Sequence, residues 1–140
     1  MDALHILAEC EEKENAAFDR GSTEHDKSPF NWEATSIELF MDVGDGASRQ
    51  IAIMPAGGVW DAKDGDMSWN SGLKARPVFT KDKWSLEMSI PYAGLGGAPK
   101  SGDRWKLMII RNAERGSEFA SCGWPVNAHR DFSSAATLVF

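Results

Sequence analysis

The stretch KWSLEMSI, residues 83–90, alternates strictly between apolar and polar side chains. The apolar members are Trp84, Leu86, Met88 and Ile90, and the residues between them are Ser85, Glu87 and Ser89. Because successive side chains of a β-strand point to opposite faces, this period of two predicts a strand that buries one face and leaves the other in water.

The same period recurs along the chain. In TSIELFMD, residues 35–42, Ile37, Leu39 and Met41 alternate with Ser36, Glu38, Phe40 and Asp42, and RWKLMIIR, residues 104–111, places Trp105, Leu107 and Ile109 on one side. Shorter strands are predicted at ALHILAEC (3–10), RQIAIM (49–54), LKARPVF (73–79) and ATLVF (136–140). Pro77 makes its strand an edge or a bulge. PYAGL, residues 91–95, is typical of a single helical turn.

Short strands separated by Gly, Asp, Asn and Pro predict an all-β antiparallel sandwich or jelly roll, formed by one domain over residues 1–140.

Composition narrows the function classes. The chain has 140 residues and a formal net charge of −6, which argues against a nucleic-acid partner because phosphate binding requires a basic face. No apolar run approaches the roughly 18 residues of a membrane span. Two cysteines, Cys10 and Cys122, could form one disulfide or remain two buried thiols. Six tryptophans against one tyrosine serve either a core or stacking platforms for sugars and bases.

Four segments carry a family resemblance. NWEATSIELFMD resembles the W-x-x-D-S-V/I-E-x-F-x-D segment of family 9 carbohydrate-binding modules and their DOMON-like relatives, and KWSLEMSIPYAGLG resembles their W-x-x-E-x-x-I-P-[FYW]-x-x-L. GDRWKLMIIRNAE is similar to G-x-x-W-x-[FL]-N-[IV]-x-R, and ASCGWPVNAHRDFSSAATLVF to the closing S-x-W-P…H-x-P-x-x-F-G-x-L-x-F. The four matches follow the family's order over residues 30–140.

The resemblance implies a β-sandwich that binds an oligosaccharide or polysaccharide without catalysis. Two tryptophans of the family clamp the terminal sugar; Trp32 matches the first, and His129 stands at the position of the second. Glu38 matches a glutamate that binds hydroxyls, whereas the family's arginine on the following strand falls near Ala52. The family's usual N-terminal strands are absent, which predicts a chain shortened at its start. Such modules are extracellular or periplasmic, as accessories to glycoside hydrolases or parts of surface proteins.

Each candidate residue also has a structural interpretation. Trp32 could fold over the end of the sandwich, Glu38 could face solvent, and His129 could be structural. Arg111 could bind hydroxyls or form a salt bridge with Glu87 or Glu38. We expect Trp84, Trp105, Met88 and Met108 in the core, and Trp60, Trp69 and Trp124 in loops at the sandwich ends, with Trp124 the best ligand candidate of those three.

Other functions remain open from the sequence. Asp61, Asp64 and Asp66 in DAKDGD form a candidate calcium loop whose spacing departs from the usual motif; no other cofactor is predicted. A glycosidase needs two carboxylates across a cleft, for which Glu38 and Glu87 are candidates if they lie on neighbouring strands. A haem-binding relative could use His5, His129 and methionines. A purely structural sandwich could form a homodimer in which a second copy covers an exposed edge.

Overall fold

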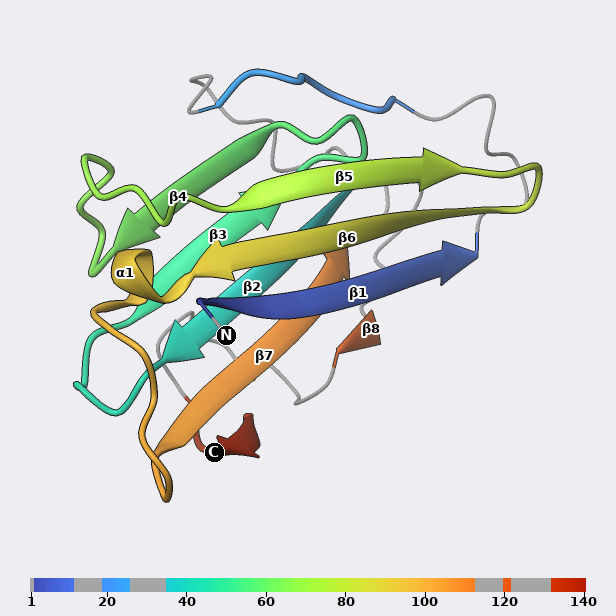
Figure 1. Ribbon diagram of the computed structural model, residues 1–140. Helices are drawn as coiled ribbons and strands as arrows, with labels where there is room; N and C mark the ends of the chain where they lie inside the picture. The colour runs from blue at the N-terminus through green and yellow to red at the C-terminus, as the bar shows by residue number, and fades with distance from the viewer. Residues whose placement is uncertain (1, 12–18, 26–34, 113–119, 122–131) are drawn as a thin grey trace.

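The computed structural model describes residues 2–11, 19–25, 35–112, 120–121 and 132–140. Two antiparallel sheets pack face to face, as predicted (Figure 1). Sheet A has the strand order β1-β6-β5, with β1 at Ala3–Glu11, β6 at Lys83–Pro91 and β5 at Lys74–Phe79. Sheet B has the order β4-β3-β2-β7-β8, with β9 also paired to β7. Its strands are β2 (Ser36–Asp42), β3 (Arg49–Ile53), β4 (Val59–Lys63), β7 (Arg104–Asn112), β8 (Ala120–Ser121) and β9 (Ala136–Val139).

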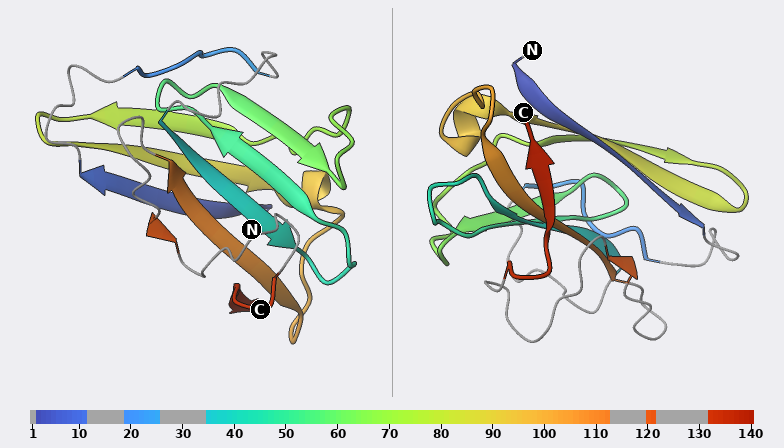
Figure 2. Two further views of the ribbon diagram at one scale, coloured as in Figure 1. Left: turned by 180° about the vertical axis from the view of Figure 1, so that it is seen from behind. Right: turned by 90° about the horizontal axis from the view of Figure 1, so that it is seen from below.

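The core lies between the two sheets and follows the predicted alternation. Ile37, Leu39 and Met41 of β2 face the apolar side chains of β6, and all are buried in one cluster. Trp84 is fully buried and Trp105 is 3% exposed, so the core assignment of both tryptophans is confirmed. Figure 2 shows from below how β9 stands beside β7 at one side of the sandwich. Cys10 is buried on β1, whereas Cys122 lies outside the described residues.

Strand β4 was not predicted, and it changes the place of one tryptophan. Trp60 lies on β4 rather than in a loop, and it is paired directly with Ala52 of β3. Trp69 does lie in a loop, where it packs half-buried against the core. The next residue of β4, Asp61, faces inward opposite Ile51. An inward aspartate breaks the apolar alternation, and for that reason VWDAK did not indicate a strand.

The predicted helical turn is α1, Tyr92–Leu95. It ends at Gly96, which adopts φ of 103°, and the N–H of Gly97 returns to the carbonyl of Tyr92 at 2.8 Å. Left-handed backbone at this position favours glycine. Pro77 also lies as predicted, because β5 is an edge strand of sheet A.

Residues 19–25 run beside the turn between β3 and β4. The N–H of Ala56 donates to the carbonyl of Arg20 at 2.8 Å, and the N–H of Gly58 donates to that of Ser22 at 2.9 Å. A Cβ on Gly58 would come within 2.3 Å of the Ser22 carbonyl oxygen, so this approach requires glycine. The Arg20 guanidinium lies 3.9 Å from the centroid of the Phe79 ring. This segment is thereby tied to both sheets.

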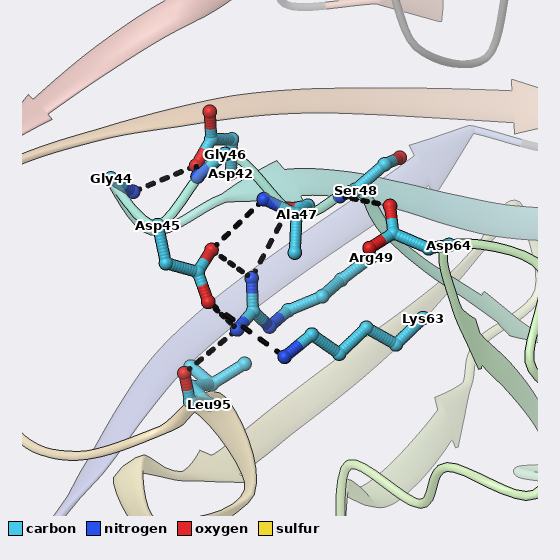
Figure 3. A network of polar contacts seen from close by, with 10 residues as sticks. All are labelled: Asp42, Gly44, Asp45, Gly46, Ala47, Ser48, Arg49, Lys63, Asp64 and Leu95. Carbon is cyan, nitrogen blue, oxygen red and sulfur yellow. Dashed lines mark hydrogen bonds and ion pairs between the residues drawn. The ribbon is translucent and has the colours of Figure 1, made fainter.

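One end of the sandwich is fixed by a buried arginine (Figure 3). Arg49 of β3 is 1% exposed and forms two hydrogen bonds with the Asp45 carboxylate, at 2.7 and 2.9 Å. It also donates to the carbonyl of Leu95 at 3.2 Å, while Lys63 approaches Asp45 at 3.8 Å. The hydrogen bond from Arg49 holds the pKa of the Asp45 carboxyl well below its usual value. The network therefore joins the β2–β3 turn to α1.

Candidate functional site

The outer face of sheet B, on the side away from sheet A, carries an unusual glutamate. Glu38 lies at the centre of β2, opposite Ala52 on β3 and Ile110 on β7. Alternation turns it away from the core, yet only 7% of it is exposed. The solvent-facing interpretation of Glu38 is therefore wrong.

Two side-chain amides hold the Glu38 carboxylate. Gln50 donates from Nε2 to Oε2 at 3.0 Å, and Asn112 donates from Nδ2 to Oε1. The same Nδ2 donates to Oγ of Ser36 at 3.0 Å. Because an amide nitrogen has two hydrogens, these bonds fix the orientation of both amides. No other described residue donates a hydrogen bond to the carbonyl oxygens of Gln50 and Asn112.

An aromatic ring lies on the same face. Trp60 shares this face with Glu38 because both are cross-strand partners of Ala52. Its ring is half-buried and packs with Ala52 and Met54. Two strand spacings, about 10 Å, separate the backbones of Trp60 and Glu38. Sequence reasoning missed this neighbour because it assigned Trp60 to a loop.

Next to this polar group, the outer face of sheet B has an apolar, covered region. Phe40, Met108 and Ile110 form a second buried cluster against which Phe132 and Ala135 pack. Met108 is thus buried as expected, but on the outer face of sheet B rather than between the sheets. The polar group of Glu38, Gln50 and Asn112 consequently lies beside an apolar wall. Such shielding strengthens its hydrogen bonds relative to bonds made in open water.

Within the part of the chain that the structure describes, none of the other predicted site residues is placed beside Glu38. Trp32, Trp124 and His129 lie outside the described residues. Arg111 is paired with Ile37, a core residue, so it faces the opposite side of sheet B from Glu38. A salt bridge from Arg111 to Glu38 or Glu87 was one interpretation of the sequence, but Glu87 pairs with Arg76 at 3.2 Å and Glu38 with the two amides. The structure therefore does not bring Arg111 and Glu38 together.

The proposed glycosidase pair is wrong. Glu38 is on β2 of sheet B and Glu87 on β6 of sheet A, so they do not lie on neighbouring strands. Each points outward from its own sheet, which places the sandwich between them. His5, considered as a haem ligand, lies exposed on β1, and its suggested partner His129 is outside the described residues.

The three candidate calcium ligands have separate contacts. Asp61 is fully buried, and its Oδ2 accepts from the N–H of Ser71 at 2.8 Å and from its hydroxyl at 2.5 Å. Asp64 accepts from the N–H of Ser48 at 2.9 Å. Asp66 accepts two hydrogen bonds from Ser68, which lower the pKa of its carboxyl. Over the described ranges, no three His, Cys, Asp or Glu side chains gather in a way that could hold a metal ion.

Comparison with solved structures identifies the architecture. A family 9 carbohydrate-binding module from Caldicellulosiruptor kristjanssonii in complex with cellotriose superposes with a TM-score of 0.65 over 99% of this chain and 69% of that one, at 16% identity. The chain has the fold of a family 9 carbohydrate-binding module. The same module in complex with glucose gives equal values over 70% of its length. A candidate carbohydrate-binding protein from Bacteroides uniformis matches the family 9 fold of this chain with a TM-score of 0.56, at 14% identity and over 97% of this chain and 70% of that one.

Sequence comparison adds nothing to this assignment, since no family model and no curated protein matches the chain. In the part of the chain that the structure describes, no helix has the length and apolar character needed to cross a membrane. The family 9 fold thus rests on the arrangement of strands, together with the resemblance of the four segments.

Proposed function

We propose that this domain binds carbohydrate, without catalysis, at the outer face of sheet B around Glu38. The observation that carries the proposal is the buried carboxylate of Glu38, which orients the amides of Gln50 and Asn112. Burying a carboxylate is costly unless hydrogen bonds compensate it, so Glu38 depends on these two amides to remain in its place. The match in fold to modules solved with cellotriose and glucose supports carbohydrate as the class of ligand.

The polar contacts follow from hydrogen-bonding capacity. A pyranose presents hydroxyls that both donate and accept, and fixed acceptors at the ring edge select their directions. The carbonyl oxygens of Gln50 and Asn112 are such acceptors, and the Glu38 carboxylate behind them strengthens the set through charge-assisted bonds. In this arrangement Glu38 acts mainly by positioning the amides, since little of its own surface reaches a ligand.

The aromatic contacts involve predicted residues beyond the described ranges. Trp32 precedes Ser36, the first residue of β2, by four residues, and His129 precedes Phe132 of the outer-face cluster by three. We assign Trp32 as the stacking platform, opposed by His129 or Trp124. Arg111 is not part of this contact set, because it faces the core side. Affinity is modest, as stacking and exposed hydrogen bonds must offset the entropy lost on binding.

The proposed function also implies where the domain acts. The neighbours are named as binding modules, in agreement with the prediction that this chain is not an enzyme. An accessory module of a glycoside hydrolase or a part of a surface protein fits such a domain, and either role places it outside the cell or in the periplasm.

Titration with a sugar panel tests the proposal. Glucose, cellobiose, cellotriose and xylo-oligosaccharides are titrated into the protein and followed by calorimetry and tryptophan fluorescence. Trp32→Ala, which removes the stacking platform, and Glu38→Gln, which loosens the two amides, are each expected to weaken binding about tenfold or more, a loss of at least about 1.4 kcal/mol. Glu87→Gln, a change of the same chemistry on sheet A, leaves binding unchanged. Absence of binding to every sugar, or wild-type affinity in both site variants, would refute the proposal.

A further inference from the structure

Sheet A ends on one side in an open strand. All nine residues of β1 pair with β6, and within the described residues β1 has no other strand beside it. The second side of β1 therefore presents backbone N–H and C=O groups that no described strand satisfies. Such an edge is a template for pairing with another chain unless the sequence protects it.

The other edge of sheet A is protected and this one is not. Strand β5 carries Pro77, which lacks an N–H, together with Lys74 and Arg76. Between Ala3 and Glu11 there is no proline, lysine or arginine. Cationic side chains and proline are common means of blocking an edge, and β5 carries both, whereas the charged residues of β1, Glu9 and Glu11, are acidic and lie in its last three positions.

The side chains of β1 are also incompletely covered. On its outer face, Leu7 at the middle of the strand is 63% exposed. On its inner face, Leu4, Ile6 and Ala8 pack against the core but stay half-buried. The corresponding inward residues of the central strand β6, from Trp84 to Ile90, are all buried. A further strand beside β1 would complete the burial of this apolar surface.

We propose that a second copy of this chain pairs antiparallel with β1 around a two-fold axis at Leu7. In this register Ala3 lies opposite the partner's Glu11, so all nine residues find a partner. Leu7 meets the Leu7 of the partner subunit, and His5 lies opposite the partner's Glu9 on both sides of the axis. The two three-stranded sheets become one sheet of six strands with the order β5-β6-β1-β1-β6-β5.

The chemistry of the paired residues selects this register over its neighbours. Outer residues must face outer residues, so the register can shift only in steps of two. A shift in either direction places Leu7 opposite a polar residue, His5 or Glu9, and leaves two residues unpaired. The chosen register instead pairs Leu7 with the partner's Leu7 and the His5 imidazole with the partner's Glu9 carboxylate. Within its own chain, Glu9 forms a salt bridge with Lys83 at 2.9 Å.

Sedimentation of the full chain tests the interface. The mass is expected to rise with concentration from 15.4 kDa toward twice that value. Leu7→Lys is expected to raise the dissociation constant at least about tenfold, because it puts two ammonium groups on the axis. Val139→Lys is the matched control, as Val139 on β9 is 62% exposed, and it leaves the dimer intact. A monomer at all concentrations, or a dimer indifferent to Leu7→Lys, would overturn the proposal.

Cysteine crosslinking tests the register. Leu7→Cys is expected to give a disulfide-linked dimer under mild oxidation, because the residue meets itself on the axis. His5→Cys alone is not expected to link, but His5→Cys with Glu9→Cys is. Wild type under the same oxidation controls for Cys10 and Cys122. Linkage by His5→Cys alone, with none by Leu7→Cys, would overturn this register, and both results are independent of sugar binding.

Discussion

Two glutamates occupy similar positions in two similar strands and have opposite environments. In SIEL on β2 and SLEM on β6, a glutamate stands between apolar residues on the outward face of its sheet. Glu38 is 7% exposed and bonded to two amides, whereas the side chain of Glu87 is 56% exposed and pairs with Arg76. A side chain that points outward from a sheet is therefore not necessarily exposed to solvent. The outer face of sheet B around Glu38 is buried although it is partly polar.

The largest expected difference comes from removing each carboxylate. Glu38→Ala leaves the half-buried Gln50 amide without its acceptor and the Asn112 amide with the Ser36 hydroxyl alone, and it opens space beside them, so we expect it to lower the free energy of unfolding by about 2–3 kcal/mol. Glu87→Ala is expected to change it by less than about 0.5 kcal/mol. Urea unfolding of both variants measures the contrast. Equal small losses would mean that the Glu38 carboxylate does not hold the amides.

The buried arginine at the sandwich end extends the comparison to cations. Arg49→Met keeps the aliphatic stem but removes the two guanidinium hydrogen bonds to Asp45 and the one to the Leu95 carbonyl, and we expect a loss of about 1–3 kcal/mol. Lys63→Met, which removes a longer contact to the same aspartate, is expected to cost less than about 0.5 kcal/mol. Thermal and urea unfolding report both values, and similar losses in the two variants would contradict the assigned roles.

The Asp45 carboxylate, which Arg49 binds, is expected to make the stability of the fold depend on pH. Because the pKa of Asp45 is lowered in the folded state, its contribution to stability is present above the unfolded aspartate pKa of about 4 and is lost as the pH falls through the folded pKa. Wild type is thus expected to be more stable than Asp45→Asn at pH 7, with the gap closing below about pH 4. Since the Asp45 side chain is 43% exposed, solvent screening keeps the gap smaller than the Arg49 effect. A gap that is constant between pH 7 and pH 3 would contradict this role.

The smallest effect is expected for the ion pair on sheet A. Arg76 and Glu87 are separated by 3.2 Å, but their side chains are 76% and 56% exposed. A double-mutant cycle with Arg76→Ala and Glu87→Ala is expected to give a coupling energy below about 0.5 kcal/mol. A coupling above about 1 kcal/mol would show that this face is as shielded as its counterpart on sheet B.

The sequence was sufficient to predict most of the strands and insufficient to predict the arrangement of the site. Alternation located β2, β6 and β7 because each has one apolar face, and it failed at β4 because Asp61 faces inward, where its Oδ2 is bonded by Ser71, ten residues later. The burial of Glu38 depends on Gln50 and Asn112, which are 12 and 74 residues away. No local pattern contains such partners. Likewise, the face of Arg111 follows from its pairing with Ile37, which the sequence does not specify.

The distribution of the tryptophans has a spectroscopic consequence. Trp84 and Trp105 are sealed in the core, while Trp60 lies half-buried on the outer face of sheet B. Emission from the first two should be blue-shifted and indifferent to a ligand, so it reports whether the sandwich is folded. A change in emission during a sugar titration would then arise from the remaining indoles, and Trp60→Phe separates the contribution of that face from any other. One intrinsic signal can thus monitor folding and binding at once.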